Sequence, residues 1–76
     1  MNKRECKFAT VLRKLMQDKG ISQNKLADKI RCGQNTIWKW LNMGVLPSAV
    51  LLMELADFFN VSIDYLVYGE GGRWSE

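Results

Sequence analysis

The sequence predicts an all-α fold made of five short helices. Four segments carry apolar residues at the three- and four-residue spacing of a helix face, a fifth is ambiguous, and no two segments alternate as paired strands do. Seventy-six residues, of which 47% are hydrophobic and 25% charged, suit one small soluble domain. We therefore expect a single compact domain over residues 1–76, with its core at about 5–68 and a flexible tail at 69–76.

The first predicted helix starts at Phe8. Its apolar residues form one stripe at i, i+3, i+4, i+7 and i+8, namely Phe8, Val11, Leu12, Leu15 and Met16. Gly20 interrupts this pattern, so the helix should end there. A second helix of about eight or nine residues follows, with Ser22 as its N-cap and an inward face of Leu26, Ala27 and Ile30. Lys25 stands where a capping box has Glu or Gln, so this cap is only half complete.

The third predicted helix follows a turn at residues 31–33. Its inward residues are Ile37, Trp40 and Leu41, and its outward residues are Gln34, Asn35, Trp38 and Lys39. The fourth helix is expected to begin at Pro47, beside Ser48, and to end near Asn60. It carries the strongest core stripe of the sequence, formed by Leu52, Leu55, Ala56 and Phe59.

Residues 61–68 could be a strand or a helix, since Val61, Ile63, Tyr65 and Val67 alternate. A helix is favoured because Ser62 can cap it and Asp64 suits a first turn. Its core stripe would then be Ile63, Leu66 and Val67. A lone strand would have no partner for its backbone groups.

The net charge of +3 hides a polarised molecule. Residues 1–42 hold ten Lys/Arg and three Asp/Glu (net +7), whereas residues 43–76 hold one and five (net −4). A basic half suggests a polyanionic partner, most often nucleic acid. The alternative is a solvated surface with uneven charge.

Composition argues against an enzyme. Histidine is absent, which removes the commonest general base and the commonest metal ligand. Cys6 and Cys32 have no C-x-x-C spacing, so we expect free thiols in a reducing cytosol. No apolar run approaches the roughly 20 residues of a membrane helix, and no apolar signal core follows the N-terminus. The sequence thus predicts a cytoplasmic protein with no metal, no cofactor, no membrane contact and no evident small-molecule effector.

Two short helices joined by a turn and flanked by longer ones describe a helix-turn-helix, whose second helix enters the DNA major groove. At this point the sequence resembles the phage Cro/repressor family, also called lambda-repressor-like or xenobiotic-response-element-like regulators. The resemblance covers about residues 8–68. It is carried, in order, by Gly20-Ile21-Ser22-Gln23, Leu26-Ala27, Thr36-Ile37, Lys39-Trp40, Leu46-Pro47-Ser48, Leu55-Ala56 and Asn60-Val61-Ser62-Ile63-Asp64-Tyr65-Leu66.

The resemblance implies a five-helix DNA-binding domain in which the helix starting near Gln34 is the recognition helix. It implies base contacts by Gln34, Asn35, Trp38 and Lys39, with Thr36 contacting bases or the backbone. It also implies phosphate contacts by Gln23 and by Asn42, just after that helix. Lys25, Lys29 and Arg31 could add phosphate contacts or could form a solvated face.

The sequence departs from the family pattern in three places. The family often pairs an arginine in the first helix with a glutamate after the recognition-helix tryptophan, where this chain has Met16 and Leu41. We hypothesise that a hydrophobic contact replaces a buried ion pair. Trp38 replaces a small or polar residue, and it either packs on a thymine methyl or sugar, or folds back over the core.

The third departure lies in the fourth helix, where Val50 and Leu51 replace polar residues. With Phe58 and Tyr65 they could form an exposed apolar patch for a homodimer, or they could complete a small core. The expected function is a sequence-specific double-stranded DNA-binding transcriptional regulator, a repressor or Cro-like switch that binds a palindromic operator as a dimer. The alternative is a protein-interaction module of the same fold, either antitoxin-like or regulator-binding.

Overall fold

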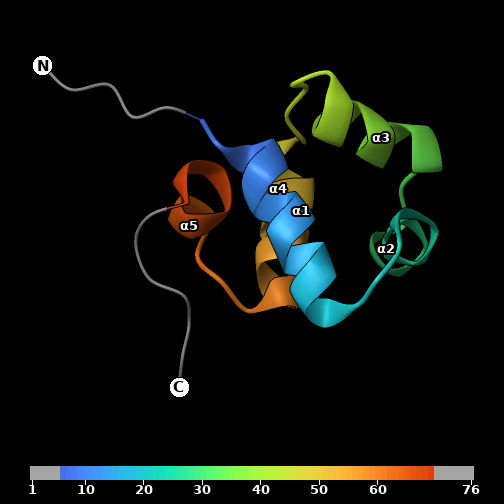
Figure 1. Cartoon of the computed structure of the whole chain (residues 1–76), viewed down its shortest axis with the longest axis horizontal. Helices are drawn as coiled ribbons and strands as arrows, with labels where there is room; N and C mark the ends of the chain where they lie inside the picture. The colour runs from blue at the N-terminus through green and yellow to red at the C-terminus, as the bar shows by residue number, and fades with distance from the viewer. Residues whose placement is uncertain (1–5, 70–76) are drawn as a thin grey trace, which may run out of the picture.

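The computed structural model describes residues 6–69. It contains five α-helices: α1 (Phe8–Lys19), α2 (Gln23–Ile30), α3 (Gln34–Asn42), α4 (Ala49–Phe59) and α5 (Ile63–Tyr68) (Figure 1). The all-α prediction is confirmed, and the ambiguous fifth segment is a helix. No helix in this part of the chain is both long enough and apolar enough to cross a bilayer. Residues 70–76, where the tail is predicted, lie outside the described residues.

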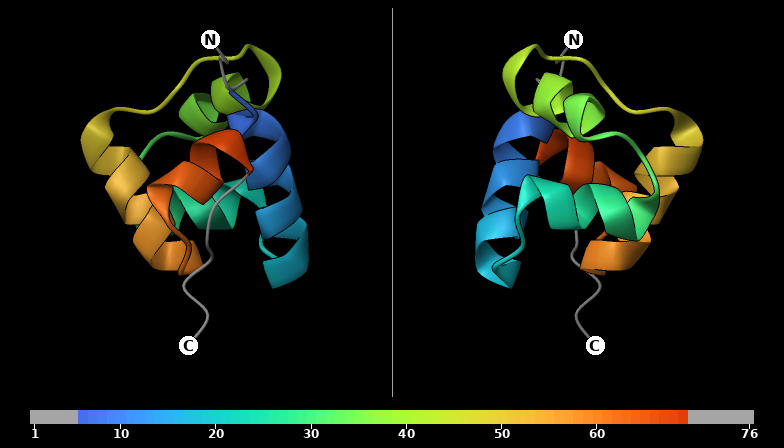
Figure 2. Two further views of the ribbon diagram at one scale, coloured as in Figure 1. Left: turned by 90° about the vertical axis from the view of Figure 1, so that its left-hand side faces the viewer. Right: turned by 90° about the vertical axis from the view of Figure 1, so that its right-hand side faces the viewer.

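The helices form a compact bundle in which α1 and α4 lie on opposite sides (Figure 2). Between them, α2 covers one face and α5 the other, and α3 lies across one end (Figures 1 and 2). Helix α1 packs against α3 and α5, while α2 packs against α3 and α4. This arrangement places α2 and α3 together on a face that α5 does not reach.

The core draws on every helix. Leu12, Leu26, Ile37, Leu55 and Leu66, one from each helix, are completely buried. Burial of each such side chain contributes about 1.5–3 kcal/mol. The rings of Phe8 and Trp40 meet edge to face with their centroids 5.9 Å apart, which fixes α3 against the start of α1. The buried side chains of α3 thus fix its inner face to the core, and its outer face makes no core contact.

Three serines cap three of the helices. Ser22, Ser48 and Ser62 accept hydrogen bonds from the backbone N–H three residues later, at 3.1, 3.4 and 3.0 Å. The capping roles predicted for Ser22 and Ser62 are confirmed. The prediction that α4 begins at Pro47 is wrong, because Ser48 is the N-cap and the helix starts at Ala49. Proline lacks the side-chain acceptor that a cap supplies, and Pro47 is buried just ahead of it.

Helices α1, α2 and α4 end in the same way. Gly20, Arg31 and Asn60 adopt the left-handed conformation with φ of 68°, 60° and 59°. The following N–H groups, of Ile21, Cys32 and Val61, donate to the carbonyls of Met16, Ala27 and Ala56 at 3.0, 3.0 and 2.9 Å. This is the Schellman motif, in which the residue after the left-handed one packs back on the helix. Each of these three residues accordingly lies in or against the core.

The Schellman motif also corrects one predicted core residue. Ile63 was expected on the core stripe of α5, but 41% of it is exposed, whereas Val61 is completely buried. Val61 takes this place because its N–H closes the end of α4, which turns its side chain inward before α5 begins. Leu66 is buried, as expected.

Candidate nucleic-acid interface

Helices α2 and α3 form the helix-turn-helix. The turn between them consists of left-handed Arg31, half-buried Cys32 and Gly33, the extended N-cap of α3. Ile37, Trp40 and Leu41 are buried beneath α3, as predicted. Because that face is fixed to the core, the opposite face of α3 is the one that projects from the domain (Figure 2).

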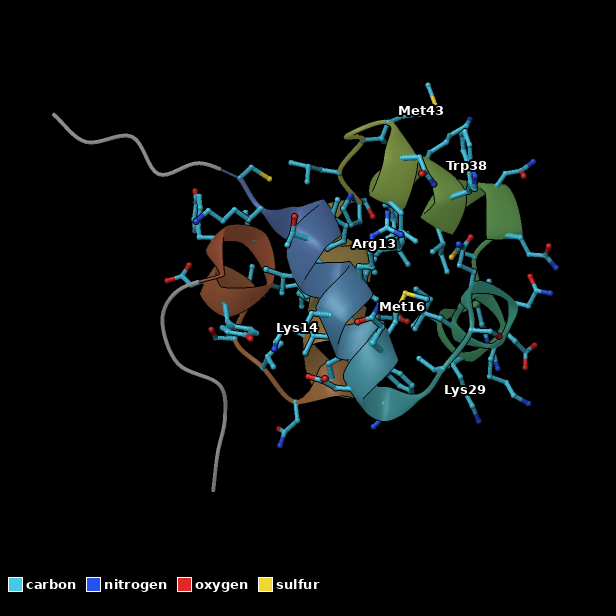
Figure 3. The ribbon with its side chains drawn as sticks, viewed as in Figure 1. Arg13, Lys14, Met16, Lys29, Trp38 and Met43 are labelled. Atoms are coloured by element: carbon cyan, nitrogen blue, oxygen red, sulfur yellow. The ribbon has the colours of Figure 1, made fainter. Side chains whose placement is uncertain are left out.

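The outer face of α3 gathers four of the five predicted base-contact residues. Gln34, Asn35 and Lys39 are exposed, and Trp38 is 50% exposed. Trp38 lies on the outer side of α3 and does not fold back over the core (Figure 3). Thr36 is half-buried, and its backbone N–H donates to the Gly33 carbonyl at 3.1 Å. It therefore flanks this face rather than belonging to it.

Two of the predicted phosphate-contact residues begin α2. Gln23 is its first residue and is half-buried, and Lys25 is exposed as its third residue, within the first turn. Asn42 is the last residue of α3, not the residue after it as predicted, and its side-chain Nδ2 donates to the Trp38 carbonyl at 3.0 Å. This bond fixes the Asn42 side chain along the outer end of α3.

A cleft of about 400 Å³ separates the end of α1, the start of α2 and the end of α3. Met16 and Leu41 both line it, and each is only 7% exposed. Both positions of the ion pair expected from the family are thus buried and apolar here. Gln23 lines the same cleft from α2.

Arg13 is a residue of this region that sequence reasoning missed. Its Nη2 donates to the Leu41 carbonyl at 3.2 Å, a contact between residues 28 positions apart. The bond satisfies a carbonyl in the last turn of α3, and the positive charge complements the negative end of the helix dipole. Apolar spacing placed Arg13 on the solvated face of α1 and carried no signal of which neighbouring helix it meets.

Positive charge surrounds the helix-turn-helix. Lys25 and Lys29 are exposed on α2, Arg31 in the turn and Lys39 on α3, with Asp28 as an exposed acid on α2. The exposed acids of α4 and α5 are Glu54, Asp57 and Asp64. The outer face of α3 therefore lies among basic side chains, although other cations of the basic half lie elsewhere, as Lys19 does with its Nζ 5.0 Å from the centroid of the Phe58 ring of α4.

For three of the four residues of the predicted dimer patch, burial favours the alternative that they complete the core. Val50 is 64% exposed, but Leu51, Phe58 and Tyr65 are half-buried and pack against the core. In a domain of this size, the core is small, and these three side chains shield part of it from water. Val50 instead joins exposed Met53 and Ile63 along a groove of about 500 Å³, whose lining also includes Glu54 and Asp57.

The cysteines are free thiols, as expected. Cys6 is exposed, and burial raises the pKa of the Cys32 thiol above its usual value. Cys32 therefore stays protonated and weakly nucleophilic at neutral pH. Within residues 6–69, no three His, Cys, Asp or Glu side chains come together as a group able to hold a metal ion.

Comparisons with known proteins agree with this geometry. A family model for the helix-turn-helix of Cro/C1 type matches residues 12–66. Among solved structures, the chain is similar to a transcriptional regulator from Listeria innocua, with a TM-score of 0.79 and 25% identity, over 95% of this chain and 67% of that one. A search of curated proteins gave no match. These findings support a DNA-binding role in transcription regulation, and the chain belongs to the Cro/C1-type helix-turn-helix family.

Proposed function

We propose that this protein is a sequence-specific regulator that binds double-stranded DNA through α3. The observation that carries the proposal is the division of α3 into a buried inner face and a projecting face of Gln34, Asn35, Trp38 and Lys39. Amide side chains such as Gln34 and Asn35 can bond both edge atoms of adenine, and Lys39 suits guanine. Trp38 supplies an apolar surface for a thymine methyl, and Thr36 contacts the neighbouring base or sugar.

Contacts to the DNA backbone flank this face. Phosphates are bound by Gln23 and Lys25 at the start of α2 and by Asn42 at the end of α3. Gln23 supports this because it lines the cleft that the last turn of α3 also lines. Such contacts set the position of the domain on the duplex, while the bases set its sequence preference. The exposed lysines of α2 add to the electrostatic attraction.

The protein acts as a repressor or Cro-like switch on a palindromic operator, bound as a two-fold dimer. A dimer would set two α3 helices about 34 Å apart, one turn of DNA, so each half-site meets one helix. Val50, Met53 and Ile63 supply the exposed apolar surface for the second copy. A dimer bound at a promoter would block RNA polymerase sterically and would catalyse no reaction. The protein would then work in the cytoplasm, at the nucleoid.

Selection of bound sequences from random duplexes tests this function. We expect one enriched palindrome and an affinity that falls steeply as salt is raised. Gln34→Ala should lose about 1–3 kcal/mol at one base pair of each half-site and relax the preference there. Wild-type affinity and preference in Gln34→Ala would contradict the assignment of α3 as the reading helix.

A second candidate function is protein interaction through the groove on α4 and α5. Its apolar lining is bordered by Glu54 and Asp57, which have no ion-pair partner among residues 6–69, so the groove suits a basic amphipathic segment. Weak binding to every duplex, with no enriched sequence, would favour this function over DNA recognition.

A further inference from the structure

We infer that Arg13 is a further DNA-contact residue, which holds the last turn of α3 and presents its free N–H groups to a backbone phosphate at the cleft between α1, α2 and α3. The inference rests on the proposed DNA-binding function and adds a contact from a helix outside the helix-turn-helix. It makes Arg13 both a positioning residue for α3 and part of the phosphate-binding surface.

The first support is the geometry of the guanidinium group. Arginine carries five N–H donors in a planar fork. One nitrogen of Arg13, Nη2, bonds the Leu41 carbonyl at 3.2 Å, and no carboxylate within residues 6–69 pairs with the group. Arg13 is exposed, and its other donors make no hydrogen bond within residues 6–69. A fixed cation with free donors is suited to phosphate.

The second support is the position of Arg13 between the two ends of the helix-turn-helix. Gln23, at the start of α2, lines the cleft that Arg13 also lines. Asn42, at the end of α3, follows the residue whose carbonyl Arg13 holds. A phosphate that meets either of these residues therefore lies near the guanidinium group. With a volume of about 400 Å³, the cleft can admit a phosphate group and water.

The neighbouring residue provides a matched control. Lys14 is also an exposed cation on α1, but it points to the other side of the helix, away from α3 (Figure 3). Arg13 points toward α3 in the same view. The two side chains therefore contribute the same charge to the domain at adjacent positions, and only one of them reaches the cleft.

The experiment measures DNA affinity of the full chain over a range of salt concentrations for wild type, Arg13→Met, Lys14→Met and Arg13→Lys. The duplex is the sequence selected from the random pool. Loss of one phosphate contact should reduce the slope of log K against log salt by about 0.9. For Arg13→Met we expect that reduction together with an affinity about tenfold lower, whereas Lys14→Met should keep the wild-type slope.

Arg13→Lys separates the two roles. Lysine keeps the charge but has no fork to bond a carbonyl and a phosphate together, so we expect the wild-type slope with an affinity a few-fold lower. If Arg13 only positions α3, Arg13→Met will lower the melting temperature and affinity at an unchanged slope, which overturns the inference. An equal drop in slope for Lys14→Met would also overturn it, since general charge would then be the cause.

The two proposals fail in different ways. Wild-type protein that binds no duplex, or shows no dependence on salt, contradicts the proposed function and this inference together. Wild-type protein that binds a selected duplex steeply with salt, while Arg13→Met retains that slope, contradicts the inference alone.

Discussion

Leu41 combines two structural roles at the end of α3. Its side chain is 7% exposed and lines the cleft with Met16, while its carbonyl accepts the hydrogen bond of Arg13. Because Met16 is apolar, it cannot supply a cation to α3. Arg13, one turn earlier in α1, makes the cationic contact with the backbone carbonyl of Leu41. A hydrophobic contact in place of a buried ion pair can be neutral or stabilising when both partners change.

Leu41→Glu should therefore destabilise the domain by about 3 kcal/mol, because a carboxylate would lose its water against the buried side chain of Met16. Thermal or urea unfolding measures this loss. Leu41→Met, which conserves the volume, should cost less than about 1.5 kcal/mol. Adding Met16→Arg to Leu41→Glu should recover much of the loss. An unchanged melting temperature in Leu41→Glu would refute the apolar-pair hypothesis.

At the scale of the element, both ends of α2 carry a cationic residue where another residue type would make the helix more stable. Ser22 Oγ accepts the N–H of Lys25, but the Lys25 side chain cannot return a bond to the backbone of Ser22. The C-cap residue of α2, Arg31, takes a left-handed conformation that glycine adopts more easily, by about 1 kcal/mol. Both departures from the most stable helix place an exposed positive charge at an end of α2.

Lys25→Gln should raise stability and weaken DNA binding at the same time. Glutamine completes the capping box, which we expect to add about 0.5 kcal/mol to the free energy of unfolding. The loss of a phosphate contact should lower affinity for all duplexes alike and reduce the salt slope by about 1. Unfolding curves and salt titrations on the same variant measure both effects. Base preference should stay as in wild type, and a changed preference would contradict the phosphate role.

The helices themselves follow closely from the sequence. The stripe from Phe8 to Met16 and the inner residues of α2 and α3 are buried where the 3.6-residue period puts them. Two predictions were wrong, the start of α4 at Pro47 and the burial of Ile63. The cap by Ser48 sets the first, and the Schellman motif that turns Val61 inward sets the second. The bond from Arg13 could not be predicted, because it depends on how α1 and α3 lie in space. Burial of Phe58 and Tyr65 depends on the same tertiary packing.

At the scale of the whole molecule, charge and exposed apolar surface lie on different faces. The basic side chains surround α2 and α3, whereas Val50, Met53 and Ile63 lie on α4 and α5 near exposed acids. A second apolar surface, formed by Met43, Val45 and Leu46, is exposed in the loop that follows α3. Both surfaces are exposed and apolar, and the proposed dimer uses the first.

Val50→Glu should weaken the dimer at least about tenfold, because a new carboxylate would enter an apolar contact that already adjoins Glu54 and Asp57. Val45→Glu is the matched control, since Val45 is 44% exposed on the loop. Sedimentation equilibrium and the cooperativity of operator binding measure the effect. Dissociation by Val45→Glu, with Val50→Glu like wild type, would move the interface to the loop.

The meeting of α1 and α5 has a practical consequence. The Lys7 N–H donates to the Val67 carbonyl at 2.6 Å, so the first and last described parts of the chain are joined side by side. This junction lies on the α5 side of α1, and α2 lies on the other side (Figure 1). Two copies fused head to tail by a Gly/Ser linker would therefore leave both reading helices unobstructed. Such a tandem chain could carry two different α3 sequences and address an operator with unequal half-sites.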